Sequence, residues 1–149
     1  ETMLFRGPSS RLQRALVTSS GQAVSVKGGY EAHRGPSLFS LFAVLPQGGS
    51  VPALIESYAG ELERLTREIV SDDELDKVRN QLRAFRVFGR QNVINRANAL
   101  ARAIQIQNDP HFESRYLEQV SRVTPEDLIR VARRDFDPNA CVVLEVHPA

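Results

Sequence analysis

The stretch LFSLFAVL, residues 38–45, decides the fold because it is apolar on both faces of an extended chain. A strand of this kind belongs in the middle of a sheet. Upstream, residues 22–27 (QAVSVK) alternate with the period of two that is typical of a strand. Parallel neighbours need a longer crossover than the short gap between these runs, so we expect an antiparallel pair.

The rest of the chain predicts helices with identifiable starts and stops. Residues 2–17 predict a helix that Gly7-Pro8 interrupts, and Ser50 can cap a second helix with apolar residues at spacings of three and four. Residues 71–74 (SDDE) read as a capping box that opens a run to about residue 107. A break is predicted near Gly89, where the apolar stripe is interrupted.

The C-terminal part predicts two short helices and a last strand. Asn108-Asp109-Pro110 ends the long run, and residues 112–120 form the next helix. Thr124 then caps a helix that has proline at its first position, and residues 140–146 (ACVVLEV) read as a strand. This order predicts an α+β fold with long helices packed on one face of a mostly antiparallel sheet. We expect one domain over residues 1–149, with its sheet cut short at the N-terminus.

Composition narrows the classes of function. The 149 residues are 42% hydrophobic and 25% charged, which supports a single domain with a core of its own. The 19 basic and 18 acidic residues give a net charge of +1, so nucleic acid is a poor first guess for a partner. The longest apolar run, residues 41–45, is far below the roughly 20 residues that span a bilayer. No membrane span is therefore predicted.

The sequence motifs alone identify no set of residues typical of a catalytic site. The histidines are scattered, without a second ligand at helical spacing, and we interpret them as surface residues. Cys141, between apolar neighbours, is predicted to be a small buried hydrophobe. The serines read as caps and the glycine pairs as turns. A run of arginines marks the polar side of the long helix and indicates a solvated or inter-domain face. The residues concerned are His33, His111, His147, Arg79, Arg83, Arg86, Arg90, Arg96 and Arg102.

Several patterns, taken in order, resemble a known family. The segments SSRL (residues 9–12), GQAVSV (21–26) and SLF (37–39) are followed by the box at 71–74 and by VTPEDL (123–128). Together they resemble the second, C-terminal α/β domain of the pitrilysin/insulinase-type zinc metallopeptidases, the family of mitochondrial processing peptidase. The resemblance covers nearly the whole chain in the right order.

The resemblance implies that the zinc site lies in an upstream domain bearing an inverted H-x-x-E-H motif. In the family the metal polarises the scissile carbonyl and activates water. The present sequence has no such motif, so we expect no metal ligand and no catalytic residue in it. Family halves that assist catalysis carry an Arg and, seven residues later, a Tyr, which hold the substrate backbone. Val17 and Val24 stand at these two positions, so no substrate-binding pair carries over.

Three readings follow. In the first, the chain forms part of the wall of a closed chamber in a zinc metalloendopeptidase, with peptides or unfolded polypeptides as substrates and a second family half as partner. In the second, the longer protein to which this chain belongs, here called the parent protein, is a non-catalytic scaffold or assembly subunit of the same family. In the third, the chain is a free-standing module whose strand at residues 22–27 captures extended peptides. The sequence leaves the compartment open, and the resemblance alone favours the periplasm.

Overall fold

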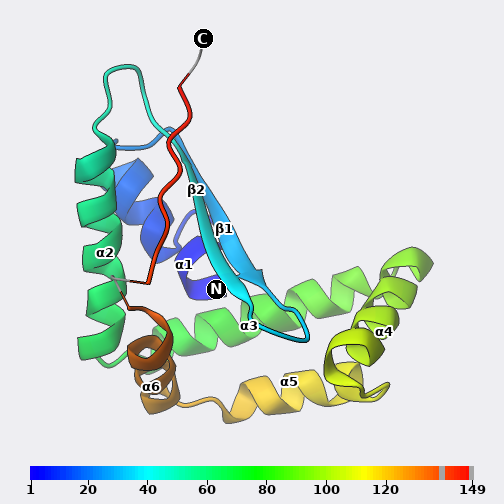
Figure 1. Ribbon diagram of the computed structural model, residues 1–149. Coiled ribbons are helices and arrows are strands. Elements are labelled where there is room, and N and C mark those ends of the chain that lie inside the picture. Colours follow the sequence, from blue (N-terminus) through cyan, green and yellow to red (C-terminus); the bar gives the residue numbers. More distant parts are fainter. Residues whose placement is uncertain (138–139, 148–149) are drawn as a thin grey trace.

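A computed structural model describes residues 1–137 and 140–147, and it places two strands and a set of helices in the predicted order up to residue 135 (Figure 1). No helix among the described residues is both long and apolar enough to cross a membrane. The elements are α1 (Thr2–Phe5), the π-helical turn η1 (Gln13–Ser19), β1 (Ser25–Glu31), β2 (Leu38–Val44), α2 (Val51–Arg67), α3 (Asp72–Gly89), α4 (Val93–Gln107), α5 (Phe112–Arg122) and α6 (Pro125–Asp135).

The two strands pair antiparallel, as predicted, with Val26 opposite Ala43. The bounds predicted for the first strand are wrong, because β1 begins at Ser25 and runs through both glycines of the Gly28-Gly29 pair. A Cβ on Gly28 would lie 2.3 Å from the carbonyl oxygen of Ser40 and 2.6 Å from the ring of Phe5. Glycine therefore belongs inside this strand, where it allows a close approach of β2 and α1.

The helices cover one face of the sheet, which confirms the α+β class. On this face the ring of Phe39 has its centre 5.5 Å from that of Phe5 and 5.0 Å from that of Phe136, and so joins β2 to α1 and to the C-terminal cap of α6. The other face of β2 is open, with Leu38 65% and Phe42 68% exposed. The expectation of a central strand is thus wrong for the described residues, because β2 is one of only two strands there.

The predicted helix starts are confirmed in most details. Ser50 and Ser71 accept hydrogen bonds from amides in the first turns of α2 and α3. Thr124 and Asp127 form a complete capping box, with N···O distances of 3.2 and 3.1 Å. The box at Ser71 is only half formed, because the Glu74 carboxylate bonds a guanidinium instead of the Ser71 amide.

The long helical run breaks near Gly89, as predicted, but the break depends on another residue. Asn92 Oδ1 accepts hydrogen bonds from the amides of Ile94 and Asn95, at 2.8 and 3.3 Å, and starts α4 as a separate helix. The apolar stripe of α3 leaves the core before this point, since Phe88 is 68% exposed.

The last predicted strand, residues 140–146, is absent from the described structure, in which residues 141–147 have no regular secondary structure (red in Figure 1). Cys141 is exposed rather than buried, and Val142 is 98% exposed. The prediction of a buried Cys141 is therefore wrong. An alternating apolar sequence becomes a strand only where a sheet edge receives it, and this segment forms no ladder with β1 or β2.

Candidate functional site

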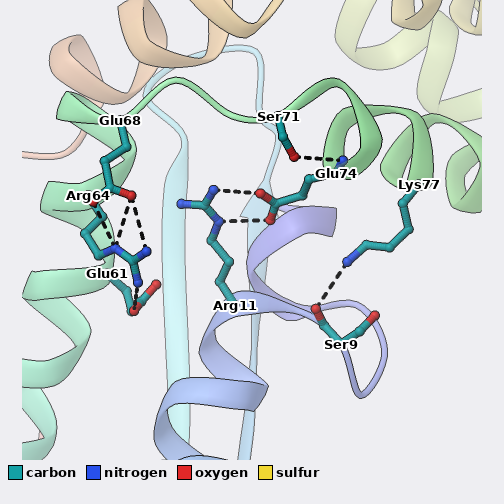
Figure 2. A network of polar contacts seen from close by, with 8 residues as sticks. All are labelled: Ser9, Arg11, Glu61, Arg64, Glu68, Ser71, Glu74 and Lys77. Atoms are coloured by element: carbon teal, nitrogen blue, oxygen red, sulfur yellow. Dashed lines mark hydrogen bonds and ion pairs between the residues drawn. The ribbon is translucent and has the colours of Figure 1, made fainter.

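An ion pair between Arg11 and Glu74 lies at the centre of a polar network (Figure 2). Arg11 Nε and Nη2 donate to the two carboxylate oxygens of Glu74 at 2.9 and 2.7 Å. Both side chains are mostly buried, with 15% and 22% of their surface exposed. This bidentate contact joins the turn before η1 to the first turn of α3, across 63 residues of sequence.

A polar hollow of about 660 Å³ surrounds this pair, with residues of η1, α2 and α3 in its lining. Lys77 Nζ donates to the carbonyl oxygen of Ser9 at 3.2 Å, and Arg64 on α2 bonds Glu61 and Glu68 (Figure 2). Arg14 also lines the hollow and makes no ion pair in the described part of the chain.

The electrostatics of the hollow keep its central pair ionised. The hydrogen bond from Arg11 lowers the pKa of Glu74, against the opposing effect of burial. The same bond raises the pKa of Arg11. A general acid or base needs a pKa near the working pH, and both shifts move these groups away from it. The pair therefore fits a role in joining helices rather than in proton transfer.

The two positions that the family resemblance singled out lie on either side of the turn that joins η1 to β1. Val17 is part of η1 and packs half-buried against the core. Val24 precedes β1, is 62% exposed, and donates its amide to Val44 at 2.7 Å. A backbone bond of 2.8 Å from Ala23 to Leu16 closes this connection. Neither aliphatic side chain carries a hydrogen-bonding group.

The residues weighed as metal ligands lie apart. His33, His111 and His147 are all exposed, and His147 pairs with Glu145 at 3.1 Å. Among residues 1–137 and 140–147, no group of three or more His, Cys, Asp or Glu side chains could hold a metal ion. The donor set that a zinc ion needs is therefore not supplied by the described residues.

Sequence reasoning missed the role of three arginines, two on α3 and one at its C-terminal cap. Arg86 pairs with Glu113 and stacks 3.9 Å above the Tyr116 ring, and Arg90 donates to the Glu113 carbonyl oxygen at 2.8 Å. Arg79 donates to the carbonyl oxygen of Val123 at 2.6 Å. These residues join α5 and its C-terminal end to α3, with Arg79 and Arg86 partly buried and Arg90 exposed. Glu113 and Tyr116 lie three residues apart and therefore share one face of α5. An acidic and an aromatic side chain on one helix face is the signal that could have indicated a contact with an arginine.

Comparison with known proteins adds a family. The model described as the peptidase M16 inactive domain matches residues 1–82. No curated protein sequence matches the chain. A protease from Helicobacter pylori has a similar structure, with 26% identity and a TM-score of 0.83 over 89% of this chain. The match spans only 32% of the Helicobacter chain, so the present chain corresponds to about a third of that protein.

Two Bordetella structures are similar over a larger share of their own length. A "putative zinc protease" from Bordetella pertussis Tohama I has 26% identity and a TM-score of 0.75, over 88% of this chain and 71% of that one. The inactive peptidase domain of a "putative zinc protease" from Bordetella parapertussis has 25% identity and a TM-score of 0.75, over 88% and 69%.

Proposed function

Since the chain belongs to the peptidase M16 family as its inactive, C-terminal domain, we propose that it forms part of the substrate chamber wall of a zinc-dependent peptidase. The zinc-bearing domain of this peptidase lies upstream in the parent protein. That domain carries out hydrolysis. The present chain shapes the chamber and supplies no group that takes part in the reaction.

The observation that carries the proposal is the aliphatic character of Val17 and Val24 at the two positions that the family resemblance singled out. Their side chains cannot donate a hydrogen bond to a peptide backbone, and no cluster of metal-ligating residues accompanies them in the described structure. A wall of this kind limits which chains enter and where they lie, without holding them for attack. Peptides and unfolded polypeptides are the substrates that suit such a chamber.

The experiment compares the 149-residue chain with its parent protein. Metal analysis after purification without chelators, together with hydrolysis of quenched peptides, should find zinc and chelator-sensitive cleavage only in the parent. A circular dichroism spectrum rich in helix provides the control that the short chain is folded. One tightly bound zinc ion per 149-residue chain, or cleavage by it, would sink the proposal.

The same experiment distinguishes the non-catalytic alternative. A parent protein that binds no zinc and cleaves no peptide, although folded, would instead be a scaffold or assembly subunit of the same family.

A further inference from the structure

The polar hollow around Arg11 and Glu74 has more positive charge than its own ion pairs use. Two of its acids are bonded by arginines of the hollow. Lys77 bonds a neutral carbonyl oxygen, and Arg14 forms no ion pair in the described part of the chain. The acid that has no ion pair there is Asp73. The charged residues of the lining are Arg11, Arg14, Arg64, Lys77, Glu61, Asp73 and Glu74.

One nitrogen of the Arg11 guanidinium has no hydrogen-bond partner among the described residues. Nε and Nη2 donate to the Glu74 carboxylate, whereas Nη1 is buried and donates to no atom of the described chain. Buried donors almost always bond an acceptor, which belongs to the protein, to water or to an ion. Nη1 is therefore a donor that an acceptor oxygen in the hollow would satisfy.

The unpartnered end of Arg11 faces a second guanidinium. Figure 2 shows this end pointing toward Arg64 on α2. The hydrogen bond to Glu74 raises the pKa of Arg11, whereas the positive charge of Arg64 opposes that rise. Two like charges that face each other repel, and an anion placed between them is attracted by both. The Arg64 side chain is 56% exposed, so it can move aside for an anion without disturbing the core.

The arrangement of the donors indicates the class of anion. A planar carboxylate is matched by the fork of a single guanidinium, as Glu74 is by Arg11. The basic groups of the hollow come instead from the turn before η1, from η1 itself, from α2 and from α3. Donors from several directions suit a tetrahedral oxyanion. The carboxylate of Asp73 can only accept hydrogen bonds, and it therefore favours an oxyanion that keeps a proton, such as hydrogenphosphate.

We propose that the hollow binds inorganic phosphate through Arg11, Arg14 and Arg64. Their guanidinium groups donate to the phosphate oxygens, and the Asp73 carboxylate accepts from the phosphate hydroxyl. The volume of about 660 Å³ has room for this ion together with the waters around it. Bound phosphate joins η1 to α2 and α3. The inference does not rest on the proposed function, because the hollow contains none of the residues on which that function depends.

Calorimetric titration of the parent protein with inorganic phosphate, at constant ionic strength, tests this proposal. We expect saturable binding that Arg14→Gln and Arg64→Gln each weaken about tenfold, which corresponds to about 1.4 kcal/mol. Arg14→Gln breaks no ion pair of the described chain, so it keeps the test valid if Arg64→Gln fails to fold. Arg67→Gln is the matched control, because it removes another exposed arginine of α2 and its ion pair with Glu63, outside the hollow. It should leave the affinity within about twofold.

Titrations with sulfate and acetate define the ligand. Both should bind at least about tenfold more weakly than phosphate, because sulfate has no proton to donate to Asp73 and acetate is planar. Equal affinity for either anion would contradict the assignment. Absence of saturable binding up to about 10 mM phosphate would overturn the site, as would an equal loss of affinity in Arg67→Gln. Binding that disappears when a chelator removes the metal of the parent protein would place the phosphate at the metal instead.

Discussion

At the scale of single residues, two groups compete for the carboxylate of Glu74, namely the amide of Ser71 and the guanidinium of Arg11. The SDDE pattern predicts that Glu74 bonds back to the Ser71 amide, as in a capping box. A guanidinium 63 residues away provides two charge-assisted bonds instead, which are stronger than one bond to a neutral amide. Local patterns cannot reveal a partner so distant in sequence.

Replacing Glu74 by Gln should destabilise the fold by about 1–2 kcal/mol, between the values typical of exposed and buried ion pairs. Asp73→Asn is the matched control, because it removes a carboxylate from the same first turn of α3 but no ion pair. Urea unfolding at pH 7 measures both variants. Equal loss of stability in the two would contradict a stabilising role for the pair.

The pH dependence of this pair has a definite sign. Because Arg11 lowers the pKa of Glu74 in the folded chain, the pair stabilises the fold fully above the unfolded value of about 4.3. That contribution is lost as the pH falls through the folded value. The stability difference between the natural chain and Glu74→Gln should therefore shrink as the pH is lowered from 7 into this range.

At the scale of elements, what could be predicted from the sequence depends on whether the signal is local. The caps at Ser50 and Thr124 and the break near Gly89 arise within a few residues, and the structure confirms them. Residues 140–146 have the alternation of a strand but no ladder in the described structure. Strand formation needs a neighbouring edge, and a local pattern does not contain that information.

Thr124→Ala should lower the free energy of unfolding by about 1 kcal/mol, the usual cost of losing a helix N-cap. The reason is the bond from the Asp127 amide to Thr124 Oγ1, at 3.2 Å. Thr124→Ser keeps the hydroxyl and should retain most of the stability. Urea unfolding provides the measurement, and a loss below a few tenths of a kcal/mol with an unchanged slope would show that the cap contributes nothing.

At the scale of the whole molecule, the sequence predicts the class of fold and, through its resemblance, the family, and both are confirmed. The exposed faces of β2 and α4 could not be predicted, because apolar stripes show which residues avoid water and not what covers them. The sequence by itself marks no site residue. Val17 and Val24 are singled out only through the family resemblance, which implies an Arg and a Tyr at these positions in halves that assist catalysis.

We propose, as the central hypothesis at this scale, that peptide hydrolysis by the parent protein needs a second family half to position the peptide. The side chains of Val17 and Val24 provide no hydrogen bonds for this purpose. Positioning of the peptide can lower the activation barrier by several kcal/mol. The most direct measurement is turnover of a quenched peptide by the zinc-bearing parent, with and without its candidate partner half. We expect efficient turnover only when both halves are present. Full turnover by a demonstrated monomer that lacks any such half would contradict it.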